Sequence, residues 1–548
     1  MIVLASMSQT HEVLNQPPPL VDYNLFETDP ILTEALRREG GEWAQEKVKE
    51  FGRRVGSVEA IQWGFQANEN PPVLHTHDRY GHRVDEVEFH PAWHNLMQLS
   101  IEFGLHNLPW REPRDGAHVA RAAMMMIASQ NEYGHLCPIS MTYSIVPSLR
   151  KEPKIAKEWE PLLHSTTYDP RFLPTKQKKG MICGMAMTEK QGGSDVRANT
   201  TRAVPVSAGS VEYLITGHKW FCSAPMSDAF LVLAQAPGGL SCFFLPRWTP
   251  DGEKNRFFIQ RLKDKLGNRS NASSEVEFEG AWAHRIGEEG RGVATIIEMV
   301  NHTRLDCVIG SAGGMRQAVV QALHHTRHRK AFGKFLIDQP LMQNVLTDLC
   351  IESEAATILM MRLARAFDQQ KNKDQEGAFR RITSAVAKYW VCKRGPMHVA
   401  EALECLGGNG FVEEGIMPRL YREMPLNSIW EGSGNVIALD VVRALEKEPG
   451  TFEALQQEIN LAKGADKRLD TFIDRLQKDR NELQSLTSVR RVVENLALAL
   501  QGSLLVRFGH PAVADAFFAS RLSGDWGHAF GTLPSKVDFQ AILKRFSW

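Results

Sequence analysis

The chain of 548 residues carries 64 Lys or Arg against 64 Asp or Glu, so its formal net charge is zero. Hydrophobic residues make up 43% and charged residues 23%, as in soluble globular proteins that bury several large cores. The length predicts about three or four domains. Global charge gives no support to a nucleic-acid-binding or membrane-surface protein.

The cysteine pattern and the terminal sequences help to predict the cellular compartment of the protein. The eight Cys residues form no C-x-x-C pair, which favours buried free thiols in a reducing compartment. The opening MIVLASMSQTHE lacks a basic region, and its apolar run is too short for a secretory signal; Met7 is an alternative start. The run LALALQGSLLV is too short to span a bilayer. We therefore expect a cytoplasmic protein without a membrane span.

Four regions differ in their sequence pattern. Residues 1–179 predict an N-terminal helical domain, in which apolar residues recur at three- and four-residue spacing from about Glu86. Residues 180–288 contain short β-branched and aromatic runs divided by turn residues, which predicts an antiparallel β domain. Residues 289–447 carry four long amphipathic stripes, which predicts an antiparallel four-helix bundle. Residues 448–548 are again helical in pattern and predict an extra C-terminal domain.

Two motifs in the predicted β domain suit a flat ligand that carries phosphate. MTEKQGGSD, residues 187–195, has consecutive glycines that let backbone approach a phosphate or a ring closely; a plain tight turn is the alternative. GHKWFCSA, residues 217–224, places a Trp in a strand, where it suits stacking on an aromatic cofactor. Taken by itself, core packing is the more common reason for such a Trp.

Two further motifs lie in the predicted bundle. HHTRHRKAFGK, residues 324–334, gathers cations at the end of a long helix and suits a phosphate contact; a solvated helix end is the alternative. His324 and His328 are one turn apart, but the cations between and beside them would repel a metal ion, and we expect no metal site. LGGNGF, residues 406–411, is either a helix C-cap or a backbone approach to a pyrophosphate.

A single carboxylate stands out in MPLNSIWEGSGNVI, residues 424–437. Glu431 lies between the bulky Trp430 and the small residues Gly432, Ser433, Gly434 and Asn435. The small residues leave room beside the acid for a flat, long ligand. The alternative is an ordinary acid near the start of a helix.

In this order and spacing, the motifs over residues 80–445 resemble the acyl-CoA dehydrogenase flavoenzyme family. RLKDKLGNRSNAS, LYREMPLNSIWEGSGN and the opening NQPPPL resemble most the branch of the alkylation-response protein AidB and its relatives. The resemblance implies an α+β fold, with an N-terminal helical domain, a middle β domain, a four-helix bundle and an extra C-terminal helical domain.

The resemblance also implies an FAD site and a catalytic base. Glu431 matches the base. In the β domain, FAD contacts are implied for Met185, Ala186, Met187, Thr188, Gln191, Gly193, Ser194, Trp220 and Ser223. Arg329 would reach the FAD pyrophosphate of a neighbouring subunit, with Phe332 beside the adenosine and Gln339, Gly407 and Gly408 at the adenine end. Around the base, Ile429, Trp430, Gly432, Ser433, Gly434 and Asn435 would wrap the cofactor.

The implied activity is the α,β-dehydrogenation of an acyl-CoA thioester, an oxidoreductase reaction on a CH–CH bond. Implied partners are an electron acceptor such as an electron-transfer flavoprotein and further copies of the chain, forming a homotetramer. One alternative is a flavin-containing DNA-binding or stress-response protein with weak or vestigial dehydrogenase activity. Residues 446–548 have 14 Lys or Arg and 13 Asp or Glu, which gives that alternative little electrostatic support. An acyl-CoA oxidase is a third interpretation.

Overall fold

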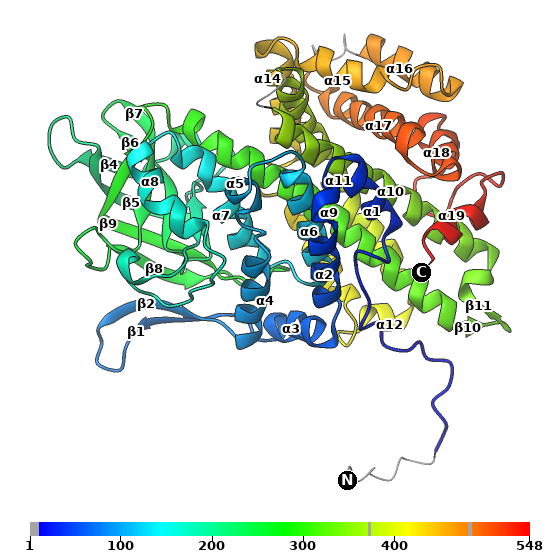
Figure 1. Cartoon of the computed structure of the whole chain (residues 1–548), viewed down its shortest axis with the longest axis horizontal. Helices are drawn as coiled ribbons and strands as arrows, with labels where there is room; N and C mark the ends of the chain where they lie inside the picture. Colours follow the sequence, from blue (N-terminus) through cyan, green and yellow to red (C-terminus); the bar gives the residue numbers. More distant parts are fainter. Residues whose placement is uncertain (1–9, 371–373, 480–484, 548) are drawn as a thin grey trace.

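The computed structural model describes residues 10–370, 374–479 and 485–547. Along the described chain, a β region separates an N-terminal and a C-terminal helical region. In Figure 1 this β region forms the left side of the molecule. This confirms the predicted order of helices, sheet, bundle and additional C-terminal helices. The proposed boundaries after residues 179, 288 and 447 each fall between elements or at the end of one.

The N-terminal region is helical but contains a β-hairpin that the sequence pattern did not predict. Strand β2 covers Glu86, where we expected helical periodicity to begin; helix α4 begins only at Pro91. Proline suits the first turn of a helix because its fixed φ is already helical, and His90 Nδ1 accepts a hydrogen bond from the Ala92 amide at 3.2 Å. The elements are α1 (Pro30–Arg38), α2 (Gln45–Val55), α3 (Val58–Glu69), β1 (Val73–His77), β2 (Arg83–Glu88), α4 (Pro91–Glu102), α5 (Leu108–Arg111), α6 (Ala117–Asn131), α7 (Leu136–Leu149) and α8 (Pro153–Leu163).

The middle region is one seven-stranded sheet whose pairings close into a ring. Strands pair in the order β6–β4–β5–β9–β7, and β7 pairs again with β6; β3 joins at β6 and β8 at β9. Most pairs are antiparallel, as predicted, but β3 and β4 run parallel to β6. The strands are β3 (Cys183–Ala186), β4 (Arg202–Pro205), β5 (Glu212–Ser223), β6 (Ala229–Ala236), β7 (Gly239–Pro246), β8 (Phe257–Leu262) and β9 (Ser273–Ile286).

The bundle is built on a central 37-residue helix, α9, whose side chains are buried along most of its length. Helices α6 and α7 of the N-terminal region pack against α9 beside its bundle partners α10 and α11. A short hairpin of β10 and β11 follows α9 where the cationic motif was noted. The elements are α9 (Gly292–His328), β10 (Lys330–Ala331), β11 (Lys334–Phe335), α10 (Pro340–Gln369), α11 (Asp374–Glu404), α12 (Gly408–Phe411), α13 (Met417–Asn427) and α14 (Gly434–Lys447).

The additional C-terminal helices pack on the outer side of α10 and α11, at the upper right of Figure 1. Buried ion pairs join the two layers: Arg521 contacts Asp348 and Glu352 of α10, and Arg394 of α11 shares Glu352. No helix in the described ranges is long and apolar enough to cross a membrane. The helices are α15 (Thr451–Asn460), α16 (Lys467–Asp479), α17 (Val489–Phe508), α18 (Pro511–Phe517) and α19 (Phe539–Arg545).

Replacing Arg521 by Met should loosen the C-terminal helices from the bundle. The change leaves Asp348 and Glu352 buried without their shared cation, which costs about 3–5 kcal/mol when one partner of a buried pair is removed. We expect a lower thermal unfolding midpoint and faster hydrogen exchange in α17. Arg53→Met removes a solvent-exposed ion pair and serves as the control, with a much smaller effect. Equal midpoints for Arg521→Met and wild type would contradict this assignment.

Candidate functional site

The loop between α13 and α14 holds Glu431 in an uncommon backbone conformation. Its φ is +59°, in the left-handed region that costs energy for residues other than glycine, and φ of Gly432 is +107°. Two cations bind the carbonyls of this bend. Arg304 Nε of α9 donates to the Glu431 carbonyl at 3.1 Å, and Lys388 Nζ of α11 donates to the Gly432 carbonyl at 2.8 Å. The bend is therefore held from two bundle helices.

The Glu431 side chain turns inward. Its Oε2 accepts a hydrogen bond from Thr303 Oγ1 of α9 at 2.8 Å. Burial raises the pKa of Glu431, while the Thr303 hydrogen bond and the charges of Lys388 and Arg304 oppose that rise. The result is a half-buried carboxylate with a raised pKa, the property that a general base needs to work near neutral pH.

A buried apolar cluster connects this loop with the β region. Trp430 packs against the same cluster as Met185 and Met187, which lie on β3 and in the turn after it. Cys137 of α7 belongs to this cluster; burial raises the pKa of its thiol to about 12, with a further rise from the charge of Glu431. A hydrogen bond with Ser223 of β5 opposes that rise. Cys137 is therefore close to both β5 and Glu431.

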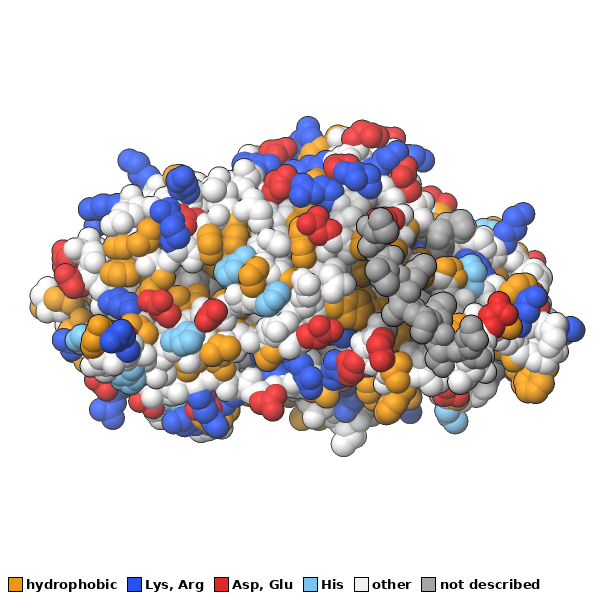
Figure 2. All heavy atoms as spheres, turned by 90° about the horizontal axis from the view of Figure 1, so that it is seen from below, with side chains coloured by type: hydrophobic (Ala, Val, Ile, Leu, Met, Phe, Trp, Pro, Cys, Tyr) orange, Lys and Arg blue, Asp and Glu red, His pale blue; other side chains and the backbone are white. Residues whose placement is uncertain are grey.

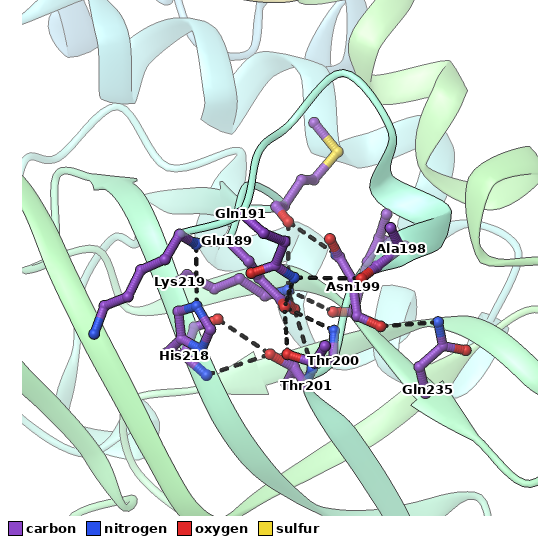
Figure 3. A network of polar contacts seen from close by, with 12 residues as sticks. Glu189, Gln191, Ala198, Asn199, Thr200, Thr201, His218, Lys219 and Gln235 are labelled. Carbon is purple, nitrogen blue, oxygen red and sulfur yellow. Dashed lines mark hydrogen bonds and ion pairs between the residues drawn. The ribbon is translucent and has the colours of Figure 1, made fainter.

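The turn after β3 is fixed by a fully buried ion pair (Figure 3). Lys219 Nζ of β5 contacts Glu189 Oε1 at 2.8 Å and also donates to the Leu233 carbonyl of β6. Glu189 accepts hydrogen bonds from the amides of Thr200 and Thr201. Burial alone would raise the pKa of Glu189, but Lys219 and these donors hold it below its usual range. The buried ion pair thus holds the backbone of the motif at residues 187–195 in place.

Trp220 is hydrogen-bonded to the turn after β3. The Trp220 amide donates to the Thr188 carbonyl at 2.9 Å. Gly193 approaches so closely that a Cβ there would lie 2.4 Å from Thr188 Oγ1, which explains the need for glycine. The hydroxyls of Thr188 and Ser194 make no hydrogen bond to any other described residue. Lys263 Nζ lies 3.1 Å from the centre of the Trp220 ring and covers one of its faces.

The other predicted cofactor-binding residues in the turn after β3 and in the Glu431 loop differ in solvent exposure. Gln191 is exposed, but its amide donates to Glu189 and to the Ala198 carbonyl, within the network of Figure 3. Ile429 is 60% exposed. Ala186 is buried. Ser433, the N-cap residue of α14, and Gly434 are half-buried, and Asn435 is exposed.

A second group of predicted residues lies at the far end of α9. Arg329 Nη1 donates to the Asn15 carbonyl at 2.8 Å, and Gln339 donates to the Ala331 carbonyl. Phe332 forms the tip of the β10–β11 hairpin and is 98% exposed. Gly407 directly precedes α12 and Gly408 begins it; both are exposed, with open space beside their α-carbons. Within the described ranges no hydrogen bond joins this group to the Glu431 loop.

Several residues around Glu431 were not found from the sequence. Thr303 and Arg304 are polar positions inside the apolar stripe of α9, and Lys388 is a lone cation inside that of α11. A charged residue in a stripe that packing buries needs a partner, and this was the available signal. Cys137 gave no such signal, because a free Cys is ordinary in a core.

The comparisons with known proteins decide the family. The AidB N-terminal domain model matches residues 15–170, the acyl-CoA dehydrogenase middle-domain model residues 184–281, and the acyl-CoA dehydrogenase C-terminal domain model residues 290–446. The AidB protein of Escherichia coli (strain K12) is 47% identical over 512 residues, covering 93% of this chain and 94% of that protein. The chain belongs to the acyl-CoA dehydrogenase family. Within it, the chain is an AidB homologue.

One further relative and two solved structures are similar to this chain. Acyl-CoA dehydrogenase family member 11 of Caenorhabditis elegans is 31% identical, covering 84% of this chain and 77% of that protein. The crystal structure of Caenorhabditis elegans ACDH-11 in complex with C11-CoA has a TM-score of 0.84 at 27% identity, covering 94% of each chain. A Bacillus anthracis acyl-CoA dehydrogenase complexed with FAD shares the fold, with a TM-score of 0.67 at 17% identity and 93% and 90% coverage.

Metal chemistry has no evident ligand set here. In the described ranges no three His, Cys, Asp or Glu side chains gather closely enough to hold an ion. His324 and His328, the pair one turn apart, contact the carbonyls of Pro18 and His324 through one ring nitrogen each. All eight cysteines are free and buried, as predicted.

Replacing Lys219 by Met should loosen the turn at residues 187–195. The Glu189 carboxylate would remain buried without its cation, which costs about 3–5 kcal/mol. Hydrogen exchange followed by mass spectrometry should show faster exchange over residues 187–201 than in wild type. Lys190→Met, at an exposed position beside Glu189, is the matched control and should leave that exchange unchanged. Wild-type exchange in Lys219→Met would show that the ion pair does not fix the turn.

Proposed function

We propose that this chain is an FAD-dependent acyl-CoA dehydrogenase in which Glu431 is the general base. Family membership supports a dehydrogenase. The observation that carries the finer proposal is the inward-facing carboxylate of Glu431, held by Thr303 and joined through one apolar cluster to the strand ends of the β region. An acid in that position has the burial and the orientation that proton abstraction requires.

The residues of the β region fit a flavin. Thr188 and Ser194 offer hydroxyl donors that no described residue uses, suited to the polar edge of a ring system. Trp220 offers a flat apolar surface beside them, and Lys263 would have to leave its face or share it with the ring. Bound there, FAD would supply the electron chemistry by accepting hydride from the β-carbon of the acyl group.

The chain itself would supply the base, its orientation and the exclusion of water. Glu431 would take the α-proton onto its carboxylate, and Thr303 would hold that group in line. Negative charge would grow on the thioester oxygen during this step, and the backbone amide of Glu431 would be a donor suited to stabilise it. Trp430 would help to exclude water, because it packs over the apolar cluster beside the acid.

An acyl-CoA is the substrate class that the relatives support. ACDH-11, whose structure covers 94% of each chain in the superposition, is complexed with C11-CoA. The electron acceptor that we propose is an electron-transfer flavoprotein. We also propose a homotetramer, because Phe332 is 98% exposed at the tip of the β10–β11 hairpin, where it is placed to reach a cofactor bound by another copy. Arg329 directly precedes that hairpin.

The DNA-binding alternative finds little support in the described surface. In the C-terminal helices, Arg468 pairs with Asp466 and Asp515, and Arg507 pairs with Glu458. Acidic and basic side chains are also interspersed over the described part of the face drawn in Figure 2, which is the underside of the view in Figure 1, away from the C-terminal helices at its top. Nucleic-acid affinity depends on unneutralised cations, so paired and alternating charges favour the dehydrogenase proposal.

Glu431→Gln should retain FAD but lose dehydrogenation. Glutamine has the shape to keep the loop packed, yet it cannot accept the α-proton, so the rate of anaerobic flavin bleaching by acyl-CoA should fall at least about a hundredfold. Glu446→Gln, an exposed acid on the helix that follows the loop, is the matched control. Bleaching at the wild-type rate in Glu431→Gln would remove Glu431 as the base.

The bleaching rate should depend on pH with an acid limb set by Glu431. Its pKa is raised by burial above the 4.5 of an ordinary glutamate, so the carboxylate is protonated, and inactive as a base, below a midpoint higher than 4.5. A stopped-flow pH series on free enzyme mixed with substrate measures that midpoint. An acid limb at or below 4.5 would show that burial does not govern the acid.

A further inference from the structure

Lys388 is a buried ammonium with an unusual set of partners. It lies in the middle of α11, is 2% exposed, and donates to two carbonyls, of Asn427 at 3.0 Å and of Gly432 at 2.8 Å. Among the described residues, no carboxylate lies within ion-pair distance of it. Burying an ammonium without a carboxylate costs free energy, and an apolar side chain at this position would avoid that cost. The fold nevertheless has a lysine here.

The two carbonyls that Lys388 binds flank the base. Asn427 ends α13, and Gly432 follows Glu431 directly, so one ammonium closes the loop across the acid. Trp430 Nε1 donates to Asn427 Oδ1 at 3.1 Å within the same loop. The left-handed bend at Glu431 is thus tied at both ends to a single side chain of α11, while Arg304 ties its centre to α9.

The charge of Lys388 also acts on the Glu431 carboxylate. The ionisable groups around that carboxylate are Arg304 and Cys307 on α9, Lys388 on α11 and Cys137 on α7. The two thiols are buried and stay neutral, with pKa values raised by burial. Besides the Thr303 hydrogen bond, the charges of Lys388 and Arg304 oppose the burial that would protonate the acid. Of these two cations, Arg304 is already paired with Asp440 at 2.7 Å.

We infer that Lys388 is a positioning residue for the base, holding the Glu431 loop in its bend and keeping the carboxylate ionised through its unneutralised charge. The inference rests on the proposed function, because it assigns Lys388 a role through Glu431. Lys388 has two effects on Glu431, one through hydrogen bonds and one through charge, and substitutions can distinguish them. The hydrogen bonds to the carbonyls set where the carboxylate lies, and the charge sets the pH at which the carboxylate can accept a proton.

Two variants of Lys388 test this inference in the FAD-loaded protein. Lys388→Met removes both donors and charge, whereas Lys388→Gln keeps a donor and removes the charge. Without the cation the pKa of Glu431 rises, so the acid limb of the bleaching rate should move up by about one pH unit in both variants. At neutral pH, Lys388→Met should be slower than wild type by about tenfold or more, and Lys388→Gln should recover part of that loss.

A second measurement needs no catalysis. Hydrogen exchange over residues 427–435, in protein without substrate, should be faster in Lys388→Met than in Lys388→Gln. Lys393→Met is the matched control: it removes a half-buried cation of the same helix that donates to neither carbonyl. It should leave the acid limb where wild type has it, because Lys393 is not among the charges that act on Glu431.

The outcomes separate this inference from the proposed function. If Glu431→Gln abolishes bleaching while both Lys388 variants keep the wild-type acid limb, the inference is overturned and the base assignment stands. If Glu431→Gln bleaches normally, the proposed function itself fails. Loss of folded protein in both Lys388 variants would also overturn the inference, because it would assign Lys388 to the stability of the bundle. An equal shift in Lys393→Met would show a general charge effect and overturn it too.

Discussion

A left-handed bend of the backbone at Glu431 and Gly432 decides where the acid of this protein points. Such a bend is unfavourable for glutamate, so the surrounding structure has to hold it. Arg304 and Lys388 do so from two different helices of the bundle, and Thr303 then fixes the carboxylate itself. The long central helix α9 supplies both Thr303 and Arg304, which links the orientation of the acid to the packing of the whole bundle.

The part of the β region that shares an apolar cluster with the Glu431 loop is also held in place by buried interactions. The buried pair of Glu189 and Lys219 anchors the turn after β3, and that turn sets the position of Trp220 through a backbone hydrogen bond. One apolar cluster, which includes Cys137, connects the β region with the Glu431 loop. A ligand that contacts both Trp220 and Glu431 would therefore bind between two rigid walls, which favours precise placement of reacting atoms.

The sequence predicted the order of the layers because long amphipathic helices and short β-branched strands carry clear periodicities. It misplaced the start of α4, since residues 86–88 pair with β1 through contacts that no local pattern records. It also missed the parallel pairing of β3 with β6, which tertiary closure of the ring decides. Glu431 was found because small residues beside an acid are conspicuous. Lys388 was not, because its partners are backbone carbonyls 39 and 44 residues away in the sequence.

The most direct test is a crystal structure of the protein with FAD and an acyl-CoA analogue that cannot be oxidised. We expect the isoalloxazine to lie against the β3 turn and Trp220, with the acyl group between the ring and Glu431. The carboxylate should lie within about 3.5 Å of the α-carbon, the distance of a near-attack arrangement. A ring bound elsewhere, or a Glu431 carboxylate turned away from the acyl group into solvent, would contradict it.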